Sequence, residues 1–120
     1  AKFNMSMCVL GMAAEYQGKI GVNALWPRTA IKTAAVSNVL GGNEMFEKSR
    51  SPEIMSDAAY IVFNKDHKTF TGNFLIDDTL LAEHGETDFS KYADYPFEEL
   101  MPDFFVPVDG YPVPKAVKES

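Results

Sequence analysis

The stretch Val22–Thr33, VNALWPRTAIKT, decides the fold because a short apolar segment stops abruptly at a proline. The run Ile20–Leu25, IGVNAL, favours a strand and alternates too little for a one-sided sheet. We therefore predict a central parallel strand that is covered on both faces. Pro27 ends this strand, since proline cannot donate to the hydrogen-bond ladder. Thr29 and Thr33 follow in a loop at the strand's carboxyl end.

Helices are predicted on both sides of this strand. Residues 1–17 carry two apolar stripes at helical spacing, which indicates a helix covered on two sides. A second helix is predicted over 51–65, with Ser51 as the N-cap and Pro52 at the first helical position. Weaker helical segments are expected between them, at 29–40 and 43–50.

A second strand is predicted over Phe70–Ile76, FTGNFLI. No hairpin signal connects the two strands, and the order helix, strand, helices, strand is typical of an α/β fold with a parallel sheet. The connection is long enough for a right-handed crossover. Two strands cannot bury the faces of several helices, so we predict that the chain is the C-terminal part of a doubly wound parallel-sheet domain.

The sequence changes character after Gly85. Five of the seven prolines fall in the segment 86–120, where they interrupt regular structure repeatedly. We therefore predict that 1–85 is the α/β part and that 86–120 is an extended tail or interdomain linker. Phe104 and Phe105 are the tail residues most expected to pack on another part of the protein.

The composition excludes several classes of function. A net charge of −6 disfavours nucleic-acid and anionic-membrane partners, and no apolar run reaches the roughly 18 residues of a transmembrane helix. The only cysteine, Cys8, excludes an internal disulfide, fits a reducing compartment and is expected to be buried. No metal site is predicted, because His67 and His84 lack ligands at suitable spacing and Asp77-Asp78 is interpreted as the end of a strand.

Three stretches carry a family resemblance by their order. AKFNMSMCVLGMAAEY, residues 1–16, resembles a helix that carries the lysine of a Tyr-x-x-x-Lys motif. IGVNALWPRTAIKT, residues 20–33, resembles a strand followed by Asn-x-x-x-Pro-Gly and a threonine. SPEIMSDAAYIVFNKDHKTFTGNFLIDD, residues 51–78, resembles a helix, a Thr-Gly strand start and an Asp-Gly-Gly end. Together they resemble the C-terminal half of the short-chain dehydrogenases/reductases, NAD(P)-dependent oxidoreductases with a Rossmann fold.

The resemblance implies that Lys2 is the catalytic lysine of this family. That lysine binds the ribose hydroxyls of the nicotinamide, and its charge lowers the pKa of a tyrosine four residues earlier, which acts as acid and base. The tyrosine and the glycine-rich phosphate loop are expected to lie before Ala1, so the chain as printed is expected to be inactive alone. The alternative is a solvated lysine at a frayed helix end.

The resemblance also implies contacts with NADP or NAD around the end of the first strand. Arg28 stands where the family has glycine, and Thr33 comes one residue later than the commonest spacing, which makes Thr29 its rival. The alternative is a proline-terminated strand with a helix-capping threonine. The expected cofactor-binding residues are Lys2, Pro27, Arg28, Thr29 and Thr33.

The loop 34–50 occupies the family's substrate-binding region. Its apolar side chains suit a lipid- or sterol-like substrate, although they also suit ordinary packing. The expected substrate-binding residues are Trp26, Leu40, Met45 and Phe46.

The resemblance implies a function for the whole protein. It would be an NADP-linked or NAD-linked oxidoreductase that moves hydride between the nicotinamide and a carbonyl or hydroxyl group of an apolar substrate. The first helix resembles the oligomer-interface helix of the family, which implies a homo-oligomer, and the compartment implied is the peroxisome or mitochondrion. The alternative is a non-catalytic truncated product that acts as an interaction module.

Overall fold

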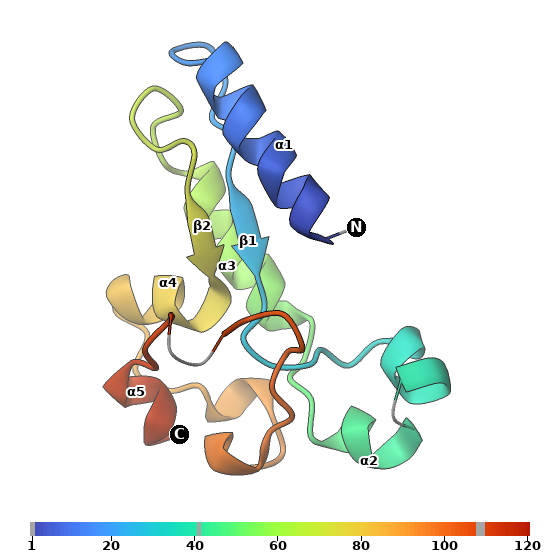
Figure 1. The fold of residues 1–120 in the computed structure, drawn as a ribbon. Coiled ribbons are helices and arrows are strands. Elements are labelled where there is room, and N and C mark those ends of the chain that lie inside the picture. Colours follow the sequence, from blue (N-terminus) through green and yellow to red (C-terminus); the bar gives the residue numbers. More distant parts are fainter. Residues whose placement is uncertain (1, 41, 108–109) are drawn as a thin grey trace.

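The computed structural model describes residues 2–40, 42–107 and 110–120. Two short parallel strands lie at its centre, and the other regular secondary structure is helical (Figure 1). In chain order the elements are α1 (Lys2–Glu15), β1 (Ala24–Trp26), the π-helix η1 (Val36–Leu40), α2 (Gly42–Glu47), α3 (Glu53–Phe63), β2 (Phe74–Ile76), α4 (Asp77–Glu83), the short helices η2 (Ser90–Tyr92) and η3 (Phe97–Glu99), and α5 (Lys115–Lys118).

The sheet pairs β1 with β2 in parallel, with Trp26 opposite Ile76. The predicted α/β class and parallel sheet are therefore confirmed. Both strands begin later than predicted because side chains replace part of the ladder before them, beside the backbone bonds from Gly72 N to Val22 O and from Ala24 N to Asn73 O. Val22 N donates to Thr71 Oγ1 at 3.0 Å, and Asn73 Nδ2 donates to the Asn23 side chain at 2.9 Å.

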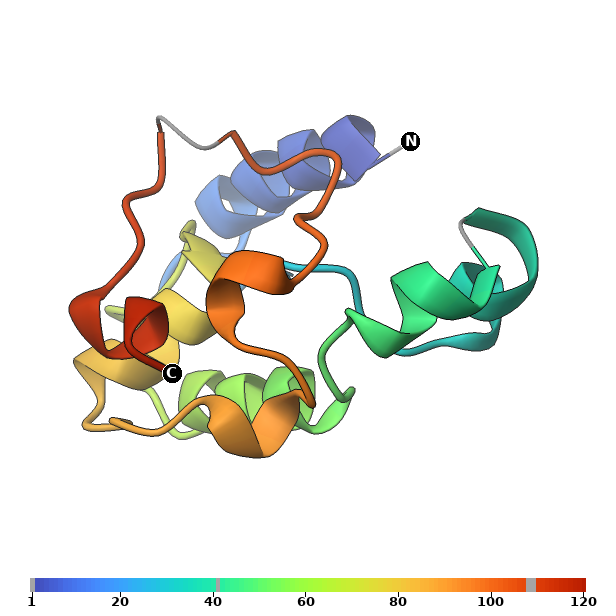
Figure 2. The ribbon, with the colours of Figure 1, turned by 90° about the horizontal axis from the view of Figure 1, so that it is seen from below.

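The two longer helices lie on opposite faces of the sheet, α1 on one and α3 on the other (Figures 1 and 2). Helix α3 begins at Glu53, one residue after the predicted start, with Pro52 rather than Ser51 as its N-cap, and Glu53 N donates to Ser51 Oγ at 3.3 Å. Ile54 and Ala58 on its inner face are fully buried. Since α3 lies between two parallel strands in the chain, it forms the crossover that the sequence indicates.

Helix α1 is covered less than the sequence predicts. Ala13 is its buried residue, whereas Phe3 is 73% and Met7 is 53% exposed. Cys8 is exposed as well, so the prediction that it is buried is wrong. The reason is that α1 presents its apolar stripes in two directions, and within the described residues the sheet and tail contact it on one side.

The segment after Gly85 is folded rather than extended. Phe89, Tyr92 and Val117 are at most 2% exposed and join Ile54 of α3 in one hydrophobic core. Proline prevents long helices here, but short helical turns still bring these apolar side chains to the core. The predicted packing residues in this segment differ from those observed, because Phe104 and Phe105 are both 64% exposed. The domain division at residue 85 stays a prediction.

The segment that follows Pro27 is extended where a weak helix was predicted. Ala30 N donates to Met101 O, and Arg50 N donates to Ala30 O at 2.9 Å. Because these backbone groups pair with distant segments, a helix cannot begin at Thr29. The loop thus joins the tail on one side and the entry to α3 on the other.

Candidate functional site

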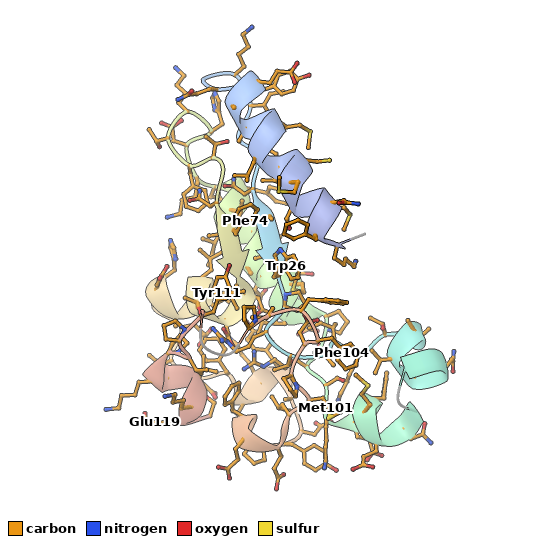
Figure 3. The ribbon with its side chains drawn as sticks, viewed as in Figure 1. Trp26, Phe74, Met101, Phe104, Tyr111 and Glu119 are labelled. Carbon is orange, nitrogen blue, oxygen red and sulfur yellow. The ribbon has the colours of Figure 1, made fainter. Side chains whose placement is uncertain are left out.

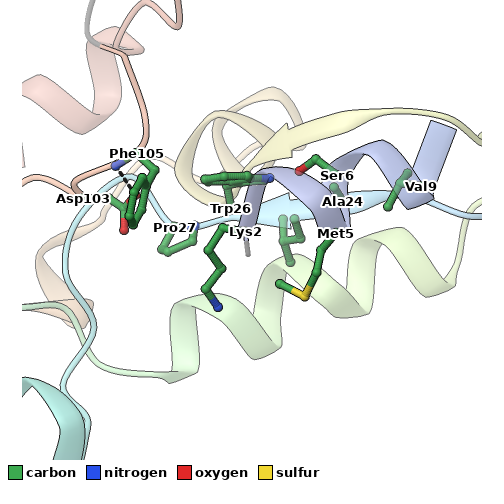
Figure 4. Close-up of a pocket in the computed structure, with 10 residues that line it drawn as sticks. Lys2, Met5, Ser6, Val9, Ala24, Trp26, Pro27, Asp103 and Phe105 are labelled. Atoms are coloured by element: carbon green, nitrogen blue, oxygen red, sulfur yellow. Dashed lines mark hydrogen bonds between the residues drawn. The ribbon is translucent and has the colours of Figure 1, made fainter.

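A cavity of about 360 Å³ opens at the carboxyl end of β1. It lies between α1, the strand end and the tail, and Figure 4 shows the Lys2 side chain between Pro27 and Met5. Open α/β sheets bind ligands beyond the carboxyl ends of their strands, so this is the expected place for a site. Its lining includes Lys2, Met5, Ser6, Trp26, Pro27 and Phe105.

Local structure explains how these side chains meet. Lys2, Ser6 and Val9 follow one another at helical spacing and therefore share a face of α1. Trp26 ends β1, and Pro27 turns the chain away from the sheet. On the tail, Asp103 N donates to Arg28 O, and Phe105 N donates to Asp103 Oδ2, both at 2.9 Å.

The donor set of the cavity fits one end of a nicotinamide cofactor. Lys2 supplies a cation and Ser6 a hydroxyl group, while Met5 and Trp26 supply apolar surface. A nicotinamide riboside needs these two kinds of contact, because its ring faces are apolar and its ribose and carboxamide are polar. The cavity can therefore place a flat ring beside a cation.

A second cavity of about 370 Å³ adjoins the first and has a more apolar lining. The two share Ser6, Trp26 and Phe105, and the second extends to Phe74 and Tyr111. Figure 3 shows Trp26, Phe74 and Tyr111 gathered between the sheet and the tail. The two adjoining cavities are called the groove from here on: Lys2 lines the first, and mostly apolar side chains line the second.

The residues predicted to bind the cofactor do not all reach this groove. Lys2 and Pro27 line it. Arg28 N donates to Asp77 Oδ1 at 3.1 Å, and the Thr29 side chain is buried and donates to Ala30 O at 3.1 Å. Thr33 Oγ1 accepts from Val36 N at 3.3 Å, as a helix-capping threonine does. The cofactor contacts of these three residues stay predictions.

The residues predicted to bind the substrate are likewise divided. Trp26 lines both cavities. Met45 is 5% exposed and packs with Ala30 and Val36, and Phe46 lies against the same cluster, which favours the packing alternative for both. The side chain of Leu40 lies outside the described residues.

Sequence analysis missed a buried charged cluster behind the loop. Asp78 Oδ1 accepts from Arg28 Nε at 2.8 Å, and Asp78 Oδ2 accepts from Arg50 Nη1 at 2.9 Å. Asp77 beside it has a pKa raised to about 6, first because burial disfavours its charge and second because Asp78 repels it. The dipeptide Asp77-Asp78 marked the end of the strand correctly, but no sequence signal joined it to Arg28 or Arg50.

Over 2–40, 42–107 and 110–120, no three His, Cys, Asp or Glu side chains gather as metal ligands. No helix in the same part of the chain is long and apolar enough to cross a membrane.

Sequence comparison finds relatives over almost the whole chain. The chain is 56% identical over 106 residues to hydroxysteroid dehydrogenase-like protein 2 of Bos taurus, an alignment that covers 88% of this chain and 25% of the relative. With the protein of the same name from Danio rerio it is 54% identical over 112 residues, which covers 93% of this chain and 26% of that relative. No family model matches.

Solved structures agree. A short-chain dehydrogenase from Mycobacterium thermoresistibile superposes with a TM-score of 0.76 at 47% identity, covering 89% of this chain and 38% of that one. The predicted resemblance to the short-chain dehydrogenase/reductase family is confirmed. A putative dehydrogenase from Xanthomonas campestris gives a TM-score of 0.79 at 45% identity, covering 89% of this chain and 39% of that one.

The match also confirms the fold class. The short-chain dehydrogenase/reductase neighbours are Rossmann-fold proteins, and this chain reproduces a part of their parallel α/β arrangement. The chain spans about a quarter of the length of the curated relatives that it matches.

Proposed function

We propose that the protein containing these 120 residues is an NAD(P)-dependent oxidoreductase, NADP-linked, acting on a carbonyl or hydroxyl group of an apolar substrate. One observation carries the proposal: Lys2 shares a cavity with Trp26 and Pro27 at the carboxyl end of β1. Similarity to dehydrogenases at about half identity supports the reaction class.

Lys2 is proposed to hold the ribose of the cofactor and to lower the pKa of a tyrosine four residues earlier. Four residues are about one helical turn, so both side chains would face the same cavity. The ammonium favours the phenolate form, which lets the tyrosine exchange a proton with the substrate oxygen near neutral pH. The cofactor, when bound, supplies or accepts the hydride.

An apolar substrate follows from the walls of the groove. Trp26, Phe74 and Phe105 line the part that extends away from Lys2, so an aliphatic or sterol-like body would be desolvated there. The reacting carbon would lie near Lys2, where charge is available. The tail supplies Phe105, so the proposed substrate surface comes from the tail rather than from Met45 and Phe46.

Oligomeric state and compartment are part of the same proposal. The apolar residues exposed on α1, Phe3 and Met7 among them, support a homo-oligomer in which this helix is covered. A peroxisomal or mitochondrial location rests on the family resemblance. A non-catalytic interaction module is the competing function, and it predicts that no reduced cofactor binds.

The test is a Lys2→Ala substitution in the protein that contains these 120 residues. Lys19→Ala, on the exposed turn after α1, is the matched control. NADPH and NADH binding is followed by fluorescence, and carbonyl reduction by loss of cofactor absorbance. A long-chain ketone, a sterol ketone and acetone serve as substrates. We expect tight NADPH binding, faster reduction of the two apolar ketones, and a loss of at least about 100-fold in kcat/KM for Lys2→Ala only. Unchanged turnover in Lys2→Ala, or no cofactor binding by the unaltered protein, would contradict the proposal.

A further inference from the structure

Arg28 joins three segments of the chain through one buried side chain. Its Nε donates to both carboxylate oxygens of Asp78, at 2.8 and 2.9 Å, and its Nη2 donates to Thr79 Oγ1 at 2.8 Å. Its Nη1 donates to Tyr111 O in the tail, also at 2.8 Å. The Arg28 side chain is 7% exposed; its bonds to Asp78 are buried, and its bonds to Thr79 and Tyr111 are partly buried. They tie the loop after β1 to the start of α4 and to the tail.

Arg50 holds the same carboxylate from the other side. Asp78 is fully buried and accepts from Arg50 Nη1 at 2.9 Å. The backbone of Arg50 pairs with the loop as well, because Lys32 N donates to Arg50 O at 2.8 Å. Two cations therefore share Asp78, and if Arg28 were replaced this carboxylate would keep a charged partner.

The segments joined by Arg28 are two walls of the groove. Arg28 directly follows Pro27, which lines the first cavity, and is two residues from Trp26, which lines both. Tyr111, whose carbonyl it holds, lines the second cavity. The carbonyl of Arg28 itself accepts from Asp103 N at 2.9 Å, which sets the path of the tail toward Phe105.

The sequence departs from the family pattern at the positions that meet here. The resemblance places Arg28 at the glycine of Pro-Gly and Asp77-Asp78 at the Asp-Gly-Gly end. In the structure Arg28 bonds to both Asp78 and Thr79. The two departures are thus complementary: Arg28 supplies the donors, and the carboxylate of Asp78 supplies acceptors for them.

We propose that Arg28, held by Asp78, is a positioning residue that fixes the tail wall of the substrate groove against the strand-end loop. The proposal rests on the proposed oxidoreductase function for its kinetic consequence, but its structural part stands on the bonds above. Arg28 touches no reacting atom in this assignment. It acts by holding Trp26 and Phe105 at the spacing that an apolar substrate needs, which reduces the ordering required on binding.

The test compares Arg28→Met, Arg28→Lys and Lys32→Met in the expressed protein. Methionine keeps the apolar stem and leaves Asp78 paired with Arg50. Lysine keeps the charge but cannot reproduce the fork that reaches Asp78, Thr79 and the tail. Lys32→Met is the matched control, because Lys32 lies on the same loop and bridges to Asp94 through an exposed ion pair.

Trp26 is the only tryptophan of these 120 residues and gives a readout that needs no substrate. In a protein with other tryptophans, these are first replaced by phenylalanine. We expect acrylamide quenching of Trp26 to rise about twofold in Arg28→Met and Arg28→Lys and to stay unchanged in Lys32→Met. We also expect KM for a long-chain ketone to rise about tenfold in the two Arg28 variants, with kcat near that of the unaltered protein.

The quenching and the kinetics together decide the proposal. Unchanged quenching in both Arg28 variants overturns the positioning role, whether or not any ketone is reduced. A fall in kcat with KM unchanged also overturns it, because that would place Arg28 in the chemical step. If the unaltered protein reduces no ketone, the proposed function fails, and the quenching result still decides the structural part. Should Arg28→Met not fold, Arg28→Lys gives the same decision.

Discussion

Helices α1 and α3 cover opposite faces of one sheet, yet the chain buries them to very different extents. Ile54 and Ala58 of α3 are fully buried, and the tail contributes Phe89 and Val117 to the same core. On α1 the apolar residues remain exposed, up to 73% at Phe3. An apolar stripe becomes a core only where another segment covers it, and here the tail covers α3.

The largest expected effect comes from truncating one phenylalanine on each side. Phe89→Ala removes a 2% exposed ring from the tail side, and we expect the free energy of unfolding to fall by about 3–5 kcal/mol. Phe3→Ala removes a 73% exposed ring and should change it by less than about 0.5 kcal/mol. Urea unfolding followed by circular dichroism measures both.

Equal losses from the two substitutions would break the comparison. A large loss from Phe3→Ala would mean that α1 is covered in solution, by a second copy or by other parts of the protein. Repeating that measurement at several protein concentrations separates the two cases, because cover by a second copy makes the loss depend on concentration.

Asp77 gives the next largest effect, and it acts through pH. Burial raises its pKa from 3.8 to about 6, so the unfolded chain releases this proton at lower pH than the folded chain does. The free energy of unfolding should therefore fall as pH rises from about 4 to 6, by about 3 kcal/mol from this group, and level off above. Asp77→Asn removes that dependence.

The measurement is urea unfolding of both proteins at pH 4, 5, 6 and 7. The stability of the unaltered protein relative to Asp77→Asn should decline across this range. Asp94→Asn is the control, because the Asp94 side chain is 77% exposed. Its free energy of unfolding should follow that of the unaltered protein across the pH range. Parallel curves for Asp77→Asn would show that Asp77 does not ionise abnormally in the fold.

The smallest effect concerns the local signal at the start of α3. Ser51→Ala removes the hydrogen bond from Glu53 N to Ser51 Oγ, and we expect a loss of about 1 kcal/mol in urea unfolding. Ser51→Asp, which keeps a capping oxygen, should restore the stability. A loss as large as that of Phe89→Ala would mean that the cap, rather than burial by the tail, holds this side together.

Local signals in the sequence were enough for most helices and strands of residues 1–85, but they missed α4 (Asp77–Glu83) and placed a helix at Thr29, where the chain is extended. Ser51-Pro52 placed the start of α3 and Pro27 placed the end of β1, because capping and ladder geometry depend on neighbouring residues. The core contribution of Phe89 and Val117 was missed, since proline-rich segments carry no periodicity that indicates burial. The exposure of Cys8 was missed for the converse reason: periodicity indicates a face but not its cover.

The site was predictable to a similar degree. Family motifs led to Lys2, Trp26 and Pro27, which line one cavity. Asp103 and Phe105 were missed because the tail returns to the strand end through backbone hydrogen bonds that side-chain patterns do not encode.

The pairing of Arg28 with Asp78 has a consequence for descent. The two positions are 50 residues apart in the chain, yet their side chains meet directly in the buried cluster. Arginine opposite glycine would bury a cation without its main partner. Aspartate opposite glycine would leave a buried carboxylate with Arg50 as its remaining arginine. Lineages that carry the arginine should therefore carry the aspartate as well, and the arginine–aspartate combination should mark a branch of the family in sequences whose structures are unknown.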